Sequence, residues 1–268
     1  MYQKVIVSII MGIYNTPDPK VLHKAIDSIR RQTFNEWECI ICDDGSTDDT
    51  YKVLRSLIGK DKRFKIIQNK ENMGLAAALN HCLKYAKGKY ITRMDADDAN
   101  FLTRLEKEAQ FLEQNLQYQL VGTAVELFDE DNVWGHRTMP EIPENKNFLW
   151  GPPFIHATIM VRRDALMQIH GYRVAKETRR TEDYDLFMRF YAEGYKGYNL
   201  QEALYYVRED KEARKRKKYR YRIDEAKIRW KGFCQLGLMP KGIFYVLKPL
   251  VVGLMPYFLL VWLRGDRY

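Results

Sequence analysis

The sequence predicts an α/β protein in which a mostly parallel central sheet lies between helices, followed by a helical C-terminal extension. Two observations support this prediction. Short apolar runs alternate with longer amphipathic stretches through the first half of the chain, and polar or acidic residues directly follow several of the apolar runs. Such β-α-β alternation favours a parallel sheet covered by helices. With 268 residues, 46% hydrophobic and 29% charged, the chain can bury a substantial core.

The first expected strand, Val5 to Met11, is apolar throughout, which is typical of a strand buried on both faces. Thr16-Pro17-Asp18-Pro19 marks a loop before a helix, on which Leu22, Ile26 and Ile29 form one inward face. The next expected elements alternate in type: a strand from Glu38 to Cys42, a helix from Asp49 to Ile58, a strand from Phe64 to Gln68, a helix from Leu75 to Ala86 and a strand from Tyr90 to Met94.

The second half of the chain changes rhythm but contains no linker, so we expect it to continue the same domain. Thr181 is expected to cap a helix whose apolar stripe includes Leu186 and Phe190. The other expected elements are a helix from Leu102 to Leu116, strands from Leu120 to Phe128, Val133 to Met139 and Phe154 to Val161, a helix from Asp164 to Ile169 and a strand that reaches about Val207.

Four loops are expected to meet at one edge of the sheet, because right-handed crossovers place the carboxyl ends of parallel strands together. They are Gly12 to Asn15, Asp43 to Ser46, Asn72 to Gly74 and Asp95 to Asp98. The last loop holds three carboxylates within four residues, and carboxylates this close repel when ionised. A divalent cation that prefers oxygen ligands would relieve the repulsion and leave positions open for phosphate oxygens. The pattern indicates an Asp-x-Asp metal-diphosphate site; the alternative is a solvated acidic turn before the helix at Leu102.

The C-x-x-C spacing of Cys39 and Cys42 is compatible with a redox or zinc pair. The two residues lie in an expected strand, however, and residues three apart on a strand face opposite sides. We therefore expect buried, reduced thiols.

The net charge of +9 is uneven, because the segment from Arg208 to Lys231 holds a large share of the Lys and Arg residues. This asymmetry indicates an anionic partner: an acidic membrane surface, nucleic acid or an acidic protein. No nucleic-acid reading motif accompanies the charge, so we expect no nucleic acid as partner. The N-terminus lacks the long apolar core of a secretory signal, which predicts a cytoplasmic location.

The stretch from Ile243 to Leu263 is mostly apolar and approaches the ~20 residues that a bilayer span needs. Lys248, Pro249 and Pro256 interrupt it. A broken helical segment that lies in the membrane interface, flanked by basic anchors, is the favoured interpretation. Packing onto the globular body and a true span are the alternatives.

From about Val5 to Tyr206 the chain resembles the inverting family 2 glycosyltransferases of GT-A fold. The motifs occur in that family's order and rough spacing: Val7 to Asn15, Asp43-Asp44-Gly45-Ser46, Asn72-Met73-Gly74, Asp95-Ala96-Asp97-Asp98 and Thr181-Glu182-Asp183. More narrowly, it is similar to bacterial exopolysaccharide (biofilm matrix) glycosyltransferases of the EpsE type, which Asn199 to Leu204 and Lys248-Pro249 also resemble. The resemblance implies a Rossmann-like GT-A domain over residues 1–208 and a basic and apolar helical segment over residues 209–268.

The resemblance also implies a site at the strand ends. It assigns nucleotide-sugar binding to Gly12, Ile13, Tyr14, Asp44, Asn72, Gly74, Asp95 and Ala96. Asp97 is the implied ligand of a Mn²⁺ or Mg²⁺ ion that neutralises the diphosphate leaving group. Asp183 is the implied general base for the acceptor hydroxyl, a role that requires a distance of ~3 Å from the proton; favourable charge at a helix N-terminus is the alternative.

Two further groups have open assignments. Arg179 and Arg180 are candidates to assist the diphosphate or to form a solvated basic loop. His156 is a candidate on the acceptor side, although a satisfied strand histidine is the favoured interpretation.

The function implied by the resemblance is sugar transfer, with inversion, from a nucleotide sugar to a lipid-linked glycan in bacterial extracellular or cell-surface polysaccharide synthesis. A UDP-sugar is the expected donor by family habit. The protein would act peripherally on the inner face of the cytoplasmic membrane, with other polysaccharide-synthesis proteins as candidate partners. The alternative is a regulatory protein that uses the transferase scaffold and its basic C-terminal surface to engage an acidic protein or a membrane.

Overall fold

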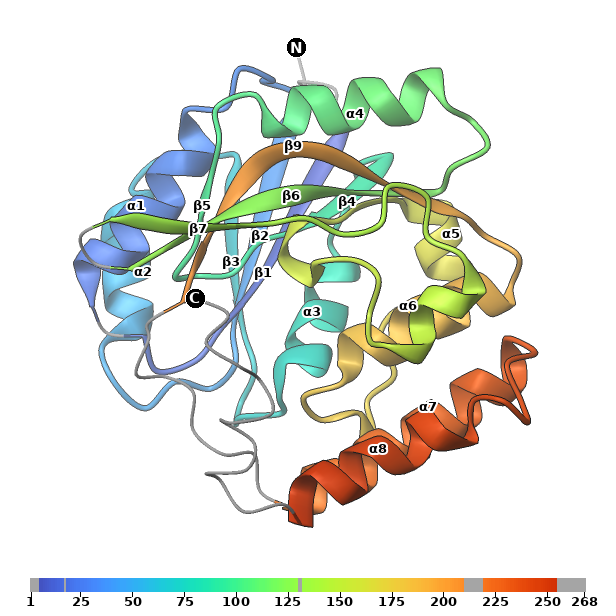
Figure 1. Ribbon diagram of the computed structural model, residues 1–268. Helices are drawn as coiled ribbons and strands as arrows, with labels where there is room; N and C mark the ends of the chain where they lie inside the picture. Colours follow the sequence, from blue (N-terminus) through green and yellow to red (C-terminus); the bar gives the residue numbers. More distant parts are fainter. Residues whose placement is uncertain (1–4, 17, 130–131, 210–218, 255–268) are drawn as a thin grey trace.

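The computed structural model describes residues 5–16, 18–129, 132–209 and 219–254. Its centre is a nine-stranded sheet with the order β3-β2-β1-β4-β8-β6-β9-β5, and β7 pairs with β6 beside this path (Figure 1). Helices pack on both faces of the sheet. The α/β class predicted from the alternating pattern is confirmed.

The first half of the chain builds the parallel part of the sheet. Its strands are β1 (Val7–Ile13), β2 (Trp37–Asp43), β3 (Phe64–Gln68) and β4 (Tyr90–Arg93). The helices between them are α1 (Pro19–Arg30), α2 (Thr50–Ile58) and α3 (Leu75–Leu83). Because these strands are parallel, their carboxyl ends open toward one edge of the sheet.

The second half adds antiparallel strands, so the complete sheet is mixed. β8 (Met160–Arg162) runs antiparallel to both β4 and β6 (Leu120–Phe128), whereas β9 (Gly197–Arg208) runs parallel to β6. The other strands are β5 (Ala99–Asn100), antiparallel to β9, and β7 (Val133–Arg137), antiparallel to β6. The helices of this half are α4 (Arg104–Gln114), α5 (Arg163–Gln168) and α6 (Glu182–Ala192).

Two apolar clusters, one on each face of the sheet, hold the layers together. Residues of α1, α2 and α4 join one cluster, and residues of α3, α5 and α6 join the other. The inward face predicted for the first helix is confirmed, since Leu22, Ile26 and Ile29 are almost completely buried. A buried side chain of this size typically contributes ~1.5–3 kcal/mol.

The cysteines follow the alternation of the strand. Cys39 and Cys42 are free and buried, and they belong to opposite clusters, which agrees with the prediction of separate buried thiols. Cys82 is also buried, whereas Cys234 is exposed.

The strand predicted from Phe154 to Val161 is wrong over most of its length. A 3-10 helix, His156–Thr158, takes its place, and β8 follows as a short strand. The hydroxyl of Thr158 donates to the carbonyl of Ile155 at 2.9 Å and its backbone N–H donates to the same carbonyl at 3.0 Å. These local bonds compete with a sheet ladder and close a turn instead.

The described part of the C-terminal segment forms two helices, α7 (Tyr219–Gln235) and α8 (Ile243–Leu254) (Figure 1). α7 packs against α6, and α8 packs against α7. Gly232 lets α7 approach α6 closely, since a Cβ there would lie 2.1 Å from Met188 Sδ. Within residues 5–254, as far as they are described, no helix is both long and apolar enough to cross a membrane. The predicted basic run from Lys211 to Lys218 and the end of the apolar stretch, residues 255–263, lie outside the described residues.

Candidate active site

The loops that follow β1 and β2 are bound to each other. The backbone N–H of Asn15 donates to Ser46 Oγ at 3.0 Å, and the N–H of Thr47 donates to Asn15 Oδ1 at 3.0 Å. Asn15 has a φ of 46°, in the left-handed region that asparagine tolerates better than most residues. Two of the four strand-end loops are therefore neighbours, as predicted.

The three residues predicted for nucleotide binding at the end of β1 differ in what they offer. Gly12 packs against α3, where a Cβ would lie 3.0 Å from Leu75 Cδ1. Ile13 is buried, and its carbonyl already accepts the N–H of Asp44 at 2.8 Å. Tyr14 has 44% of its surface exposed. Of the three, Tyr14 presents a side chain that a planar base can stack on.

Asp44 is buried, and its carboxylate binds the loop that precedes α3. Its oxygens accept hydrogen bonds from Asn69 Nδ2 at 2.7 Å, from the N–H of Met73 at 3.0 Å and from the N–H of Gly74 at 2.7 Å. Gly74 has a φ of 89°, which residues with a Cβ rarely adopt. Asp44 thus positions the loop from Asn72 to Gly74, and an ionised carboxylate keeps acceptor capacity beyond these three bonds.

The three carboxylates at the end of β4 have different environments. Asp95 forms an ion pair with Arg93, and Asp98 is buried and accepts the backbone N–H of Arg208 at 2.8 Å. Burial raises the pKa of Asp98 to about 8, and the charges of Asp95 and Asp97 act in the same direction. The pKa of Asp97 is also raised, first by desolvation and then by Asp95, although its side chain reaches solvent. The repulsion predicted for this loop is therefore present.

A ligand set for a metal ion at this loop would include few protein groups. Among the described residues, no group of three or more carboxylate, imidazole or thiol side chains is placed to hold a metal ion. Because Arg93 and the N–H of Arg208 engage Asp95 and Asp98, Asp97 is the carboxylate of this loop that faces outward. One carboxylate, completed by phosphate oxygens and waters, is a common way of binding Mg²⁺. The residues present fit a metal that is shared with the nucleotide.

Tyr172 is a buried tyrosine whose pKa responds to charges of the acidic loop and of the N-terminus of α6. Burial raises its pKa, and the charges that act on it belong to Arg93, Glu182, Asp183 and Asp95. Burial also raises the pKa of Glu182, and the adjacent Asp183 adds to this rise. Such charge effects require proximity. The carboxylates predicted at the end of β4 and at the start of the α6 helix therefore both act on the pKa of one buried phenol.

Asp183 is half-buried in the first turn of α6, where its Oδ1 accepts the N–H of Tyr184 at 2.7 Å. The predicted capping role of Thr181 is wrong. Thr181 occupies the cap position, but its hydroxyl donates to the carbonyl of Glu177 at 3.3 Å and makes no capping bond. The reason is the 3-10 helix Lys176–Thr178, which brings that carbonyl within reach of the hydroxyl.

His156 is a buried histidine with a satisfied ring. Its Nε2 lies 2.8 Å from the hydroxyl of Tyr172, and burial lowers its pKa well below the usual value. This agrees with the favoured interpretation of a satisfied histidine, although the residue lies in a 3-10 helix and not in a strand.

A cavity of about 830 Å³ opens between the loop before α3 and the segment before α6. Its lining includes Asn72, Gly74, Arg179, Arg180 and Glu182. Its size lies in the range of small-molecule sites, ~300–1,000 Å³. The other predicted site residues are not part of this lining: Gly12, Ile13, Tyr14, Asp44, Asp95, Ala96, Asp97 and Asp183.

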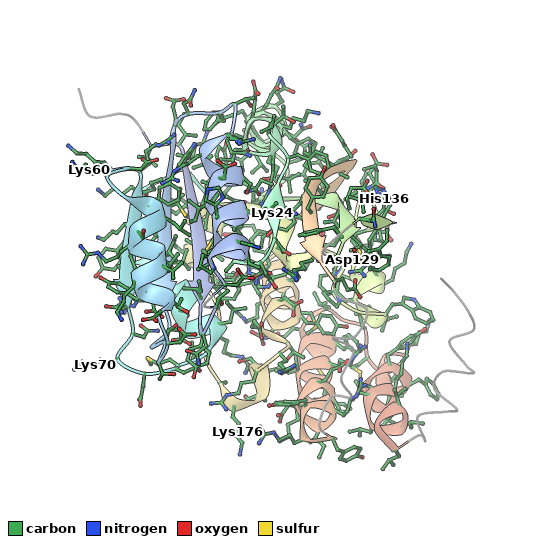
Figure 2. The ribbon with its side chains drawn as sticks, turned by 90° about the vertical axis from the view of Figure 1, so that its left-hand side faces the viewer. Lys24, Lys60, Lys70, Asp129, His136 and Lys176 are labelled. Carbon is green, nitrogen blue, oxygen red and sulfur yellow. The ribbon has the colours of Figure 1, made fainter. Side chains whose placement is uncertain are left out.

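The cavity lies at the end of the sheet where the loop after β3 ends. Figure 2 shows Lys70, from that loop, and Lys176, from the cavity wall, toward the same end of the molecule. The Nζ atom of Lys24 lies 3.9 Å from the ring centroid of Phe128. Figure 2 shows Lys24 and Asp129 away from the end of the molecule where Lys70 and Lys176 lie.

Sequence reasoning missed three side chains that organise the site: Tyr172, Tyr205 and Tyr221. The hydroxyl of Tyr205 accepts the N–H of Asp95 at 3.1 Å, and Tyr221 of α7 lines the cavity. Tyr205 and Tyr221 are distant in sequence from the residues that they contact, and Tyr172 is distant from the carboxylates whose charges act on its pKa. Their sequence neighbourhoods carry no motif that could have indicated these contacts.

The mixed α/β sheet and its strand-end loops define the class of this protein. The family model described as Glycosyl transferase family 2 matches residues 8–170. The chain belongs to this family, as its motifs predicted.

The sequence is 47% identical over 251 residues to the putative glycosyltransferase EpsE of Bacillus subtilis (strain 168), a match that covers 93% of this chain and 90% of the relative. It is 30% identical over 231 residues to the UDP-Gal:alpha-D-GlcNAc-diphosphoundecaprenol beta-1,3-galactosyltransferase of Escherichia coli, covering 83% and 82% of the two chains. The predicted similarity to EpsE-type enzymes is confirmed.

The crystal structure of S. aureus TarS 1-349 in complex with UDP-GlcNAc aligns with a TM-score of 0.69 and 19% identity. The alignment covers 93% of this chain and 72% of that chain. It shows that the two proteins share the GT-A fold.

Proposed function

We propose that this enzyme transfers a sugar, with inversion, from a UDP-sugar to a lipid-linked glycan at the cytoplasmic face of the bacterial membrane, in the synthesis of an extracellular or cell-surface polysaccharide. The carrying observation is one cavity that is lined by the loop before α3, by two arginines and by Glu182, whose neighbour Asp183 acts together with the acidic loop on the pKa of Tyr172. The relative from E. coli is named for a UDP-linked donor and a diphosphoundecaprenol-linked acceptor. Other polysaccharide-synthesis proteins are candidate partners.

In this proposal the nucleotide binds along the loops after β1, β2 and β3. Tyr14 offers an exposed ring to the base, and Asp44 holds the loop from Asn72 to Gly74 against the cavity. Asp95 and the backbone at Ala96 face the ribose. Arg179 and Arg180, whose side chains line the cavity, approach the diphosphate.

We propose Asp183 as the general base. It lies in the first turn of α6, next to Glu182 in the cavity wall, and it shares the Tyr172 environment with the acidic loop. The carboxylate would take the proton of the acceptor hydroxyl while that oxygen attacks the anomeric carbon from the side opposite the nucleotide. Attack from that side inverts the configuration of the carbon.

Asp97 would hold a Mn²⁺ or Mg²⁺ ion together with the donor. A divalent ion at this position supplies charge neutralisation to the leaving diphosphate. The role of the chain is to keep Asp97 turned outward, since Arg93 pairs with Asp95 and the N–H of Arg208 binds Asp98.

Membrane attachment is supported by the described part of the C-terminal segment. α8 exposes four large apolar side chains at intervals of three or four residues: Phe244, Leu247, Val251 and Leu254. The Nζ atom of Lys248 lies 5.2 Å from the ring centroid of the exposed Trp150. Apolar stripes bordered by cations and tryptophan are typical of helices that lie in the membrane interface.

The test is a transfer assay with radiolabelled UDP-sugars and a short-chain prenyl-diphosphate-linked GlcNAc acceptor, with and without Mn²⁺. Asp183→Asn should abolish transfer and leave UDP binding within about twofold of wild type, because the base acts in the chemical step. Asp97→Asn should reduce both transfer and the stimulation by Mn²⁺. NMR of the product should show an inverted anomeric centre. Transfer by Asp183→Asn at the wild-type rate, or a retained configuration, would refute the assignment.

A further inference from the structure

A second, smaller pocket adjoins the cavity on the side of α7. It has a volume of about 290 Å³ and lies between the segment around the 3-10 helix Lys176–Thr178 and the first two turns of α7. Three residues line both spaces: Lys176, Arg179 and Tyr221. The two spaces are therefore separated by a wall of shared side chains.

The smaller pocket is positively charged. Its lining holds four cationic side chains, Lys176, Arg179, Arg220 and Lys227, against the carboxylates of Glu177 and Asp224. Glu177 is itself paired with Arg173 at 3.4 Å. Within the described residues, Lys176, Arg179 and Lys227 form no ion pair, whereas the neighbouring α7 cations Arg222 and Arg229 both pair with Glu225. Cations in excess of carboxylates around a concave space favour an anionic ligand.

Tyr221 stands between the two spaces with an arginine on either side. The guanidinium carbon of Arg180 lies 5.4 Å from its ring centroid and that of Arg220 lies 4.8 Å from it. Arg220 Nη2 also donates to the hydroxyl of Tyr221 at 2.8 Å. Arg180 has a φ of 65°, a conformation that is uncommon for a residue with a Cβ and is often found at functional sites. Of these two arginines, Arg180 lines the cavity and Arg220 lines the smaller pocket.

An exposed apolar face continues from the pocket along α7. Ile223 belongs to the pocket lining and is 41% exposed, and Trp230, two turns further on the same face, is 50% exposed. Lys227 lies between them at helical spacing. A cationic pocket with an apolar exit matches a diphosphate that carries a hydrocarbon chain.

We propose that this pocket binds the diphosphate of the lipid-linked acceptor, with the prenyl chain leaving along Ile223 and Trp230. The inference rests on the proposed function for the nature of the acceptor. The donor diphosphate would bind on the cavity side of Tyr221 and the acceptor diphosphate on the α7 side. The acceptor sugar would then project into the cavity, toward Glu182 and Asp183. The smaller pocket thereby selects acceptors that carry a diphosphate.

The first experiment is calorimetric titration of the full-length protein with geranyl diphosphate. The pocket variant is Arg220→Ala/Lys227→Ala, and its matched control, Lys231→Ala/Lys241→Ala, removes the same charge at exposed positions outside both spaces. Charged hydrogen bonds of this kind predict that the pocket variant binds at least about tenfold more weakly, while the control matches wild type. UDP should bind all three proteins equally. Equal affinity of the three for geranyl diphosphate, or a parallel loss of UDP binding in the pocket variant, would overturn the proposal.

A second experiment separates the lipid diphosphate from an anionic membrane surface. The fraction of protein that co-sediments with phosphatidylglycerol vesicles should be the same for the two double variants, because both have lost two surface charges. If the pocket variant alone loses vesicle binding and still binds geranyl diphosphate as wild type does, the cluster is a membrane contact and the proposal is wrong.

The transfer assay adds a kinetic comparison. The pocket variant should show a raised KM for GlcNAc linked through a prenyl diphosphate and an unchanged KM for GlcNAc on a neutral alkyl chain. A similar rise for both acceptors contradicts a diphosphate contact. If wild type transfers sugar to neither acceptor, the proposed function fails, and the calorimetric comparison still decides whether the pocket binds a prenyl diphosphate.

Discussion

Arg104, at the start of α4, connects the segments that carry the acidic loop. Its guanidinium donates to Asn100 Oδ1 at 2.6 Å, to Thr92 Oγ1 at 2.7 Å and to the carbonyl of Arg93 at 3.2 Å. It also pairs with Glu108 at 3.2 Å, and both side chains are at most 1% exposed. Replacement of Arg104 by methionine keeps an unbranched stem but removes the guanidinium, and it leaves Glu108 buried without its partner.

The expected cost follows from this burial. Removing one member of a buried ion pair typically costs ~3–5 kcal/mol, a large part of the ~5–15 kcal/mol that stabilises a native domain. Arg104→Met should therefore lower the free energy of unfolding by about 3–5 kcal/mol. The matched control is Lys107→Met on the same helix, whose ion pair with Glu202 is exposed and should contribute about 0–1 kcal/mol.

The assay is urea denaturation followed by circular dichroism at constant pH. The double variant Arg104→Met/Glu108→Leu should recover most of the loss, because it removes the buried charge together with its partner. If Arg104→Met loses no more stability than Lys107→Met, or if the double variant is no more stable than the single one, burial of an unpaired Glu108 is not what destabilises the protein and the reasoning is refuted.

Three further predictions concern pH, the nucleotide loop and the membrane. Burial raises the pKa of Glu108 from 4.5 to about 7, so between these values the folded state keeps a proton that the unfolded state releases. The free energy of unfolding should therefore fall as pH rises through this range. Glu108→Gln should flatten this dependence of the free energy of unfolding on pH, measured by urea denaturation at a series of pH values. Asp44→Ala leaves two backbone N–H groups before α3 without their hydrogen-bond acceptor. The change should weaken UDP binding at least about tenfold in calorimetry. The control Asp49→Ala removes an exposed carboxylate nearby and should leave UDP binding unchanged. Phe244→Asp/Leu254→Asp should reduce sedimentation with anionic vesicles without lowering stability, since both side chains are more than 70% exposed; unchanged sedimentation would exclude α8 as the contact.

The first half of the fold could be predicted because its signals are local. Most strands are largely apolar, the helices have a buried stripe, and most boundaries carry glycine, proline or aspartate. The second half followed these signals less well. Around residues 154–161, the apolar run is partly a turn, because Thr158 bonds to a nearby carbonyl instead of joining a ladder. Composition cannot distinguish these two uses of the same residues.

The candidate site was predictable as a set of motifs, and less so as an arrangement. The close spacing of Asp95, Asp97 and Asp98 is visible in the sequence. Its consequence, repulsion that helps to raise the pKa of Asp97 and of Asp98, follows from that spacing. That Asp98 turns inward to the N–H of Arg208 depends on β9, more than a hundred residues away. Asp44 likewise binds a loop about thirty residues further along the chain.

Periodicity and motif spacing are properties of neighbouring residues, so the class of fold, the family and the acidic strand ends could be read directly from the sequence. Three features depend on the packing of distant segments: the position of β8 between β4 and β6, the burial of Tyr172 where both groups of carboxylates act on its pKa, and the pocket beside α7. Each of these depends on which distant segments pack together. That choice minimises the free energy of the whole chain, so no single stretch of sequence specifies it.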